Sequence, residues 1–189
     1  MTAPPLWNAS DAMAATGGRV SGDWTATGIS IDTRTLERGD LFVALAGPNF
    51  DGHDFVAAAF ENGAGAALVA ESAAGSLGEN PGLIVADPLT ALRRLAIAGR
   101  QRTHAKIVAV TGSVGKTGTK EALAHVLSPQ GSTCFSKNSL NNHWGVPLSV
   151  ARMQAATKFG VFEIGMNHPG EITPLVEIVR PDVAVITAI

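Results

Sequence analysis

The sequence predicts an α/β protein in which a small N-terminal α/β domain precedes an incomplete, mostly parallel sheet with helices on both faces. Three observations predict this class. Short apolar runs alternate with helical patterns along the 189 residues, and the runs of the second half are continuously apolar, as in buried parallel strands. A glycine-bounded loop ending in Lys116 and Thr117 joins one of these runs to a helix. With 46% apolar residues, the chain can bury a core of this size.

The N-terminal domain is assigned to residues 1–86, where short strands and small helices are separated by Gly, Asp and Asn. Its predicted strands are residues 28–31, 41–45, 66–70 and 82–85. Between the second and the third of them, a helical spacing of apolar residues starts at Phe55 and ends before Gly63. We expect Trp7 and Trp24 to lie in a core or at a domain interface.

The second domain, residues 87–189, is predicted to begin with a helix at Asp87 and Pro88. Asp87 can cap the free amides of a first turn, and Pro88 suits a first helical position because it has no amide hydrogen. The later elements are a strand at 107–110, a helix over 116–127, strands at 132–135 and 160–164, a helix capped by Thr173, and a strand at 183–187. We expect a fragment of a longer protein, because the edge of the last apolar strand would otherwise be exposed.

Composition and charge exclude several classes of function. The net charge is -2, with 14 basic and 16 acidic residues and no basic run, so we do not expect nucleic acid as a partner. No stretch approaches the ~18 apolar residues of a membrane span, and the N-terminus lacks the pattern of a signal peptide. We therefore expect a cytoplasmic protein with no membrane span. Cys134 is the only cysteine, which rules out an intramolecular disulfide and a zinc site built from cysteines.

The loop T-G-S-V-G-K-T that follows Val110 is typical of the phosphate loops that bind ATP or GTP. Gly112 and Gly115 permit backbone angles that other residues avoid, so successive amides can point at an anion on the N-terminus of the next helix. Lys116 would reach the outer phosphates, and the Thr117 hydroxyl would bind Mg2+. The eight-residue form of this loop needs glycine in place of Val110, so the chain has a shorter form. The alternative is an ordinary turn that contains Gly-Lys-Thr.

Polar residues gather where the other predicted strands of the second domain end. Glu163 lies near the end of its strand, where it could meet the Mg2+ held by Thr117; the alternative is a partly exposed glutamate at a strand end. The following loop, 165–172, places glycine and polar residues at the same sheet edge, which favours the metal role. Residues 138–148 are rich in amide side chains, which bind sugars and peptides but also form turns.

These motifs, in this order and along nearly the whole chain, resemble those of the ATP-dependent Mur ligases of peptidoglycan synthesis, and within them the branch that adds D-alanyl-D-alanine. The loop at 111–117 resembles the family's short phosphate loop, and residues 141–148 and 163–172 resemble its central-domain signatures. The segments that resemble the UDP-binding domain shared with the tripeptide-forming branch are 32–34, 39–45 and 51–55.

The resemblance implies a UDP-substrate domain joined to part of a P-loop-type ATPase domain. The implied reaction joins UDP-MurNAc-tripeptide to D-Ala-D-Ala, with ATP and Mg2+, through an acyl phosphate. Lys116 and Glu163 would be catalytic, and Thr117 and Glu163 would bind the metal. The nucleotide would be bound by Gly112, Ser113, Val114, Gly115, Lys116, Thr117 and Gly118. The substrate would be bound by Thr33, Arg34, Asn49, Asp51, His53, Asn141 and Asn142.

Mur ligases carry further parts that this sequence lacks: another metal-binding histidine, a carbamylated lysine, an adenine pocket and a C-terminal domain. We therefore expect the chain alone to be inactive. Three other interpretations stay open. The tripeptide-forming branch shares the first-half motifs but is not expected to show residues 141–148. A non-catalytic nucleotide-binding module has no reason to carry a separate domain with residues 32–34. An interaction protein could bind a partner through the exposed edge near 183–189.

Overall fold

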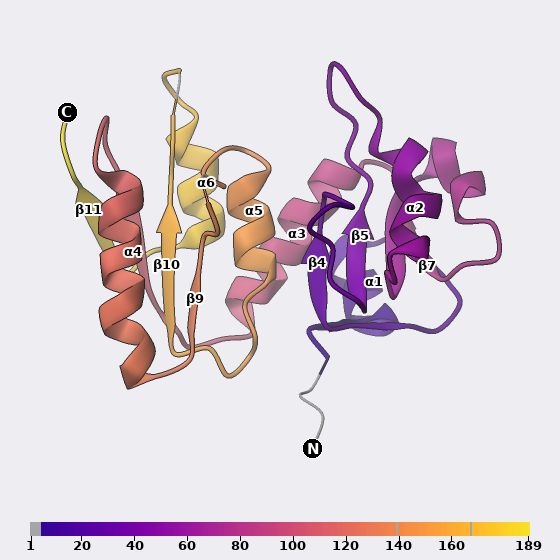
Figure 1. The fold of residues 1–189 in the computed structure, drawn as a ribbon, viewed down its shortest axis with the longest axis horizontal. Helices are drawn as coiled ribbons and strands as arrows, with labels where there is room; N and C mark the ends of the chain where they lie inside the picture. The colour runs from indigo at the N-terminus through magenta and orange to yellow at the C-terminus, as the bar shows by residue number, and fades with distance from the viewer. Residues whose placement is uncertain (1–4, 139, 167) are drawn as a thin grey trace. The chain divides into compact units, whose positions relative to one another are not determined.

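The computed structural model describes residues 5–138, 140–166 and 168–189 (Figure 1). Ser139 and Asn167, which belong to two of the motif loops, lie outside the described residues. The structure is a mixed α/β protein whose two larger sheets are mostly or fully parallel, which confirms the predicted fold class.

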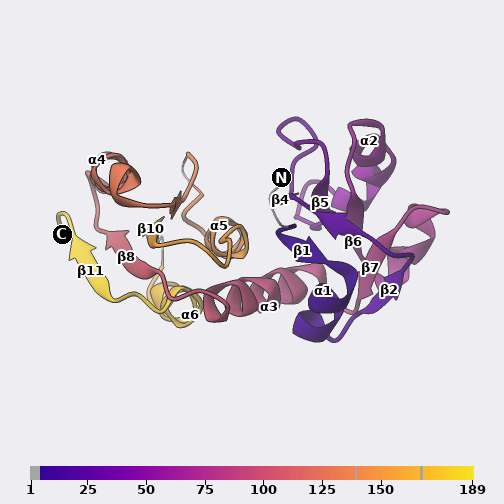
Figure 2. The same cartoon turned by 90° about the horizontal axis from the view of Figure 1, so that it is seen from below.

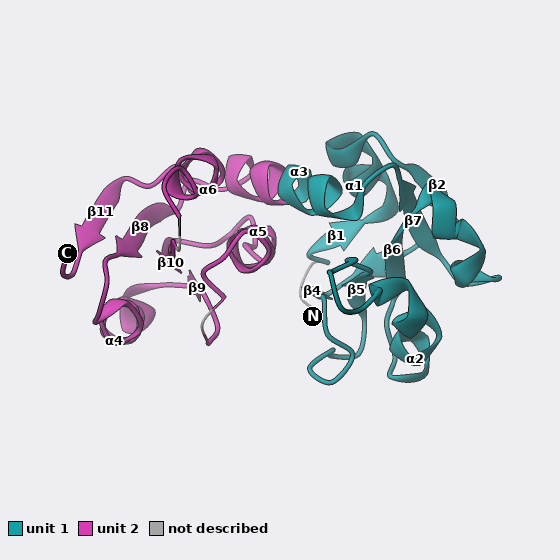
Figure 3. Ribbon diagram, turned by 90° about the horizontal axis from the view of Figure 1, so that it is seen from above, with its two compact units in different colours: residues 1–95 teal, residues 96–189 magenta. Residues whose placement is uncertain are grey.

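The chain divides into two compact units, residues 1–95 and 96–189 (Figure 3). The division falls inside the helix α3 (Pro88–Gln101). We predicted that this helix starts at Pro88, as it does, and placed the domain boundary at its start. The assignment of residues 1–86 and 87–189 to two functional domains stays a prediction.

The first unit contains a five-stranded mixed β-sheet and a separate pair of short strands. The strands of the unit are β1 (Trp7–Asn8), β2 (Arg19–Ser21), β3 (Thr25–Ala26), β4 (Gly28–Ser30), β5 (Asp40–Val43), β6 (Ala66–Ala70) and β7 (Gly82–Val85). The sheet has the order β2-β7-β6-β5-β4, in which β4 to β7 run parallel and β2 is antiparallel to β7. β1 and β3 form a separate antiparallel pair. The four strands predicted from the sequence form the parallel part of the sheet.

Short helices cover this sheet. They are α1 (Ala9–Thr16), α2 (Val56–Glu61) and the 3-10 helices η1 (Gly52–Phe55) and η2 (Glu71–Leu77). Phe42, Val69 and Ile84 of the sheet pack with Val56 of α2 and Leu77 of η2. Side chains alternate along a strand, so their neighbours point to the opposite face; Leu41, Leu68 and Leu83 are also fully buried. Both faces of the sheet are therefore covered.

The sequence did not predict α1, although Asn8 carried a signal for it. The Asn8 side chain accepts a hydrogen bond from the amide of Asp11, which caps the first turn of α1. The apolar face of α1 consists mainly of alanines, and this weakens the periodic pattern. Trp7 and Trp24 are buried in this unit, as expected, and the indole nitrogen of Trp24 donates to the carbonyl of Gly82.

The second unit contains a fully parallel sheet. Its strands are β8 (Lys106–Thr111), β9 (Thr133–Phe135), β10 (Phe159–Glu163) and β11 (Val183–Ile186), in the order β11-β8-β10-β9. Its other helices are α4 (Lys116–Leu127), the 3-10 helix η3 (Ser128–Gln130), α5 (Gly145–Ala151) and α6 (Ile172–Val179). α4 packs on one face of the sheet, and α5 and α6 pack on each other and on the opposite face (Figure 2). The predicted parallel sheet with helices on both faces is confirmed.

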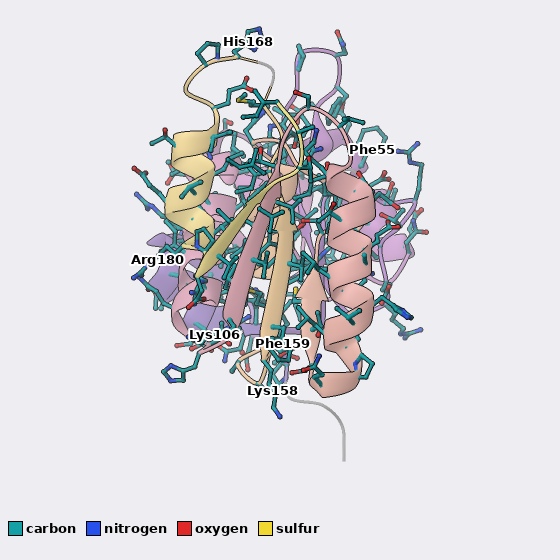
Figure 4. The ribbon with its side chains drawn as sticks, turned by 90° about the vertical axis from the view of Figure 1, so that its left-hand side faces the viewer. Phe55, Lys106, Lys158, Phe159, His168 and Arg180 are labelled. Atoms are coloured by element: carbon teal, nitrogen blue, oxygen red, sulfur yellow. The ribbon has the colours of Figure 1, made fainter. Side chains whose placement is uncertain are left out.

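All strands of this sheet point the same way, so one of its edges collects their carboxyl ends. Figure 4 shows Lys106 and Phe159, the first residues of β8 and β10, at one end of the sheet and His168 at the opposite end. The phosphate loop after β8 and the motif loop after β10 both leave from the end that carries His168. Ligands of open α/β sheets bind at this end.

Two local predictions differ from the structure. Thr173 is not the cap of α6, because the helix already begins at Ile172 and Thr173 lies in its first turn. Glu171 occupies the cap position, and its carboxylate accepts from the amide of His168. The other difference is α5: residues 145–151 form a helix that begins within the amide-rich residues 138–148 and runs past them, where no helix was predicted.

Candidate functional site

The phosphate loop has the backbone shape that its glycines were expected to permit. It connects β8 to α4, and Gly112 and Gly115 adopt φ angles of 132° and 87°. A Cβ atom on Gly112 would collide with the Thr187 hydroxyl and the backbone of Ala188. The loop ends at the N-terminus of α4, whose first amides have no acceptor within the helix and carry partial positive charge. This geometry suits a phosphate group.

Lys116 lies across this loop. Its ammonium group donates to the carbonyl oxygens of Gly112 at 2.6 Å and Ser113 at 3.2 Å. The side chain is half-buried, and α4 begins at this residue. A positive charge therefore stands next to the amides that would receive a phosphate.

The segment after β11 supports the loop from outside. The Ser113 amide donates to the carbonyl of Ala188 at 2.8 Å. The Thr187 hydroxyl lies 2.6 Å from the Val114 carbonyl oxygen and 3.2 Å from that of Thr111, to either of which it can donate its proton. Thr187 was not among the predicted site residues. Its position directly after an apolar strand at the carboxyl edge was the available signal.

Glu163 joins three elements at the same edge. Its carboxylate accepts from the Thr117 hydroxyl at 2.9 Å and from the Asn141 side-chain amide at 2.7 Å. Thr117 belongs to α4 and Glu163 to β10, while Asn141 follows β9. The residue is 1% exposed, so it is not the partly exposed strand-end glutamate of the alternative interpretation.

This arrangement fits a divalent cation. Both oxygens of Glu163 accept from neutral groups, and neutral donors leave the net charge of a buried carboxylate uncompensated. Carboxylate, hydroxyl and phosphate oxygens are the ligands that Mg2+ prefers. In the described part of the chain no group of three His, Cys, Asp or Glu side chains could hold a metal by itself. A Mg2+ ion at Glu163 would therefore complete its shell with hydroxyl, phosphate or water oxygens.

The amide-rich segment serves two structural tasks next to this carboxylate. The Asn142 side-chain oxygen accepts from the amides of Trp144 and Gly145, which caps the start of α5. The Asn141 carbonyl accepts from the Gly165 amide at 2.8 Å, and this ties the segment to the loop after β10. Asn141 is thus directed at Glu163, whereas the Asn142 side-chain oxygen is used by its own helix.

Two predicted substrate residues of the first unit lie in the loop after β4. Arg34 pairs with Asp32 through two guanidinium nitrogens, the shortest contact being 2.6 Å from Nη2 to Oδ2. Hydrogen bonding by Arg34 lowers the pKa of Asp32. The Arg34 side chain is 86% exposed. The carbonyl of Thr33 accepts from the side-chain amide of Asn62, which fixes the loop against the end of α2.

The other predicted substrate residues of this unit follow β5: Asn49 lies in a loop, Asp51 caps the 3-10 helix η1, and His53 lies in that helix. Asn49 is exposed. His53 Nδ1 lies 2.5 Å from the carboxylate of Asp51, and Nε2 accepts from the amide of Ala70 at 3.0 Å. The accepting Nε2 leaves the proton on Nδ1, which donates to Asp51. His53 is 10% exposed, so it fastens its loop to the end of β6 and offers little surface to a ligand.

Two other observations bear on function. Burial raises the pKa of the Cys134 thiol to about 11, and its sulfur donates to the Ser149 carbonyl, as an inert thiol would. Of the helices in the described residues, none combines the length and the apolar character needed to cross a membrane.

Comparisons with known proteins agree with the motifs. The Mur ligase middle domain matches residues 110–189, and the catalytic domain of the Mur ligase family matches residues 25–100. The UDP-N-acetylmuramoyl-tripeptide--D-alanyl-D-alanine ligase of Rickettsia prowazekii is 36% identical over 97% of this chain and 40% of its own length. The Escherichia coli enzyme of the same name is 43% identical over 87% of this chain and 36% of its own length.

Solved structures give the same result. MurF from Acinetobacter baumannii matches 97% of this chain and 40% of its own length, with a TM-score of 0.83 and 38% identity. The MurF ligase of Thermotoga maritima in complex with ADP matches 85% of this chain and 37% of its own, with a TM-score of 0.62 and 31% identity. The chain spans about two fifths of the length of these relatives.

Proposed function

The chain belongs to the Mur ligase family, and we propose that it forms the substrate-binding domain and part of the ATP-binding domain of a ligase that joins D-alanyl-D-alanine to UDP-MurNAc-tripeptide. The names of its relatives support this choice of branch. The use of ATP and of nucleotide-linked substrates is the reason to propose a cytoplasmic enzyme.

The proposed reaction has two chemical steps. The terminal carboxylate of the tripeptide attacks the γ-phosphorus of ATP, so a carboxyl-phosphate bond forms as the bond to ADP breaks. The amine of D-Ala-D-Ala then attacks the acyl carbon, and the tetrahedral intermediate expels phosphate to leave the amide. Because the first step brings two anions together, the protein must supply positive charge and directed donors at the phosphate.

The phosphate loop is proposed to supply them. Its amides, from Gly112 to Gly118, would bind the β- and γ-phosphates, and Lys116 would turn from the loop carbonyls to the transferred phosphoryl group. Mg2+ would neutralise phosphate charge when bound. Thr117 and Glu163 are the residues that would hold it, with Asn141 orienting the carboxylate.

The loops of the first unit are proposed to bind the UDP part of the substrate. Thr33 and Arg34 are the main candidates. The pair between Arg34 and Asp32 is exposed, so exchanging the carboxylate for a diphosphate would cost little. Asn49, Asp51 and His53 are weaker candidates, because His53 is already engaged by Asp51 and Ala70. Asn141 and Asn142 are proposed to face the muramyl peptide or the phosphates.

The convergence of Thr117 and Asn141 on buried Glu163 is the observation that carries the nucleotide part of the proposal. It places a carboxylate beside the hydroxyl that follows the phosphate-loop lysine, which is the pairing that a metal-nucleotide site needs. An ordinary turn containing Gly-Lys-Thr would have no reason to face a buried carboxylate 46 residues away.

Calorimetric titration of the chain with UDP-MurNAc-tripeptide tests the substrate part. We expect saturable binding that weakens about tenfold in Arg34→Ala, as expected for one lost charged hydrogen-bond partner. Arg19→Ala is the matched control, because Arg19 is exposed on β2 at the opposite edge of the sheet from β4. Equal affinities for wild type and Arg34→Ala would remove Arg34 from the substrate site.

Two comparison ligands separate the other interpretations. Tighter binding of UDP-MurNAc-dipeptide than of the tripeptide would favour the tripeptide-forming branch. Binding of magnesium-ATP without binding of either UDP substrate would favour a nucleotide-binding module, and the assignment of the first unit would then be wrong.

A further inference from the structure

Lys120 is a buried lysine that the proposed reaction does not use. It lies in α4, one helical turn after Lys116, and its side chain is 1% exposed. Lysines are almost never fully buried unless their ammonium group has partners, because removing that charge from water is costly. An apolar side chain of similar length would fill the same space without this cost.

The main partner of Lys120 is a carbonyl of the amide-rich segment. Its ammonium group donates to the Asn138 carbonyl oxygen at 3.1 Å, and the carboxylate of Glu121 lies 3.7 Å away. Asn138 has a φ angle of 51°, in the left-handed region that L-residues rarely adopt. Lys120 therefore contacts a backbone position of uncommon geometry soon after the end of β9.

Residues on both sides of Asn138 in the sequence contact Glu163. At one side of Asn138, the Ser136 hydroxyl accepts from the Glu163 amide at 3.3 Å. At the other side, Asn141 contacts the Glu163 carboxylate and accepts from the Gly165 amide. These three contacts tie the chain on either side of Asn138 to β10 and its following loop. The contact from Lys120 ties it to α4, the helix that carries the phosphate loop.

We propose that Lys120 is a positioning residue that holds the amide-rich segment in register with the phosphate-loop helix. By fixing the Asn138 carbonyl, it sets the position from which Asn141 orients Glu163 toward Thr117. This proposal rests on the proposed function, since it assigns Lys120 an effect on metal-nucleotide binding. Lys120 acts through Asn141 and Glu163.

The test compares ADP binding with and without Mg2+ in the whole chain and its variants. Lys120→Met removes the ammonium group and keeps the unbranched side chain as far as Cε, whereas Lys120→Arg keeps a cationic donor. Asn138→Ala loosens the same contact from the other side, because alanine disfavours a φ of 51°, and Asn138→Gly is its matched control, because glycine accepts that angle. Asn138 is exposed, so its variants are expected to fold even if Lys120→Met does not.

We expect Lys120→Met and Asn138→Ala to weaken binding of magnesium-ADP by about tenfold, the effect of losing one hydrogen bond to a charged group, and to change metal-free ADP binding by less than about threefold. Lys120→Arg and Asn138→Gly should stay near wild type. A merely structural lysine would weaken both forms of ADP equally, or neither, and either result would overturn the positioning role while leaving the proposed function intact. If the wild-type chain binds no ADP with Mg2+, the nucleotide site of the proposed function is wrong and the role of Lys120 falls with it.

Discussion

The two units hold their predicted functional side chains in different ways. In the second unit, Glu163 is contacted by Thr117 and Asn141, which lie 46 and 22 residues away in the sequence. In the first unit, Arg34 pairs with Asp32 and His53 with Asp51, each only two residues away. Long-range contacts require the folded chain, whereas local ones can persist in part after unfolding. The fold therefore builds the nucleotide site, and local sequence builds most of the substrate loops.

The largest effect that this comparison predicts is on the phosphate loop. Gly112→Ala should lower the free energy of unfolding by about 3 kcal/mol, because alanine disfavours a φ of 132° and its Cβ would meet Thr187 and the backbone of Ala188. Urea denaturation of the chain measures the change. The strain arises from contact with a segment 75 residues further along, so it tests whether the fold shapes the loop.

Gly118→Ala is the control for this prediction. Apart from its neighbours and the backbone of its own helix, no atom of the described residues lies within 4 Å of the Cβ that it would add, and the residue lies in α4. We expect it to raise the free energy of unfolding by roughly 0.5 kcal/mol, since alanine favours helix more than glycine does. Equal changes in the free energy of unfolding for the two substitutions would contradict the view that contacts with Thr187 and Ala188 shape the loop.

The next effect concerns the carboxylate at the centre of the nucleotide site. Glu163→Gln keeps the shape of the side chain and one of its two acceptor oxygens but removes its charge. We expect the affinity for magnesium-ADP to fall about 100-fold, or ~2.7 kcal/mol, and metal-free ADP binding to change little. Glu177→Gln, an exposed position on α6, is the matched control in the same titration. Unchanged magnesium dependence in Glu163→Gln would remove Glu163 from the metal site.

The difference between local and long-range contacts also determines how much of the fold could be predicted from the sequence. The parallel strands of both sheets were predictable, because short apolar or β-branched runs between turn residues are typical of strands. α5 was not, because its seven residues are all buried and therefore show no amphipathic pattern. The short pair β1 and β3 contains only two residues per strand, which is too few for an alternating pattern to appear.

In the candidate site, too, residues marked by local sequence could be predicted, and residues that depend on long-range contacts could not. Gly112, Lys116 and Thr117 lie within six consecutive residues, so their spacing alone indicated a phosphate loop. Glu163 could be placed at the correct sheet edge from the end of its strand. The contributions of Lys120 and Thr187 could not be predicted, because each depends on which backbone carbonyl the folded chain brings to it.

A smaller effect on stability is expected at His53, which makes a long-range contact in the first unit. His53→Ala removes the acceptor for the Ala70 amide, 17 residues away, and should lower the free energy of unfolding by about 1–2 kcal/mol. Asp51→Asn alters only the local, half-exposed partner and should cost less than about 0.5 kcal/mol. Thermal or urea unfolding compares the two variants. A larger loss in Asp51→Asn would show that the local contact is the one that matters.

The smallest effect compares two aspartates whose pKa is lowered in the folded chain. The Ile107 amide, and then Lys106, lower the pKa of Asp182 across 75 and 76 residues, whereas Arg34 lowers that of Asp32 across two. A lowered folded pKa adds stability above the usual carboxyl pKa, and this stability is lost as the pH falls through the folded value. Because the local pair can survive unfolding, Asp32 should add less to this pH dependence than Asp182.

Urea unfolding of Asp182→Asn and Asp32→Asn from about pH 7 to about pH 3 measures this difference, since the usual aspartate pKa lies within that window. Asp182→Asn should flatten the acid-induced loss of stability by a few tenths of a kcal/mol, a modest amount because its side chain is 34% exposed and solvent screens its contacts. Asp32→Asn should leave the slope near that of the wild type. If both substitutions reduced the pH dependence of the free energy of unfolding equally, the Asp32–Arg34 pair would depend on the fold as much as the contacts of Asp182 do. The contrast between local and long-range contacts would then not hold for these two aspartates.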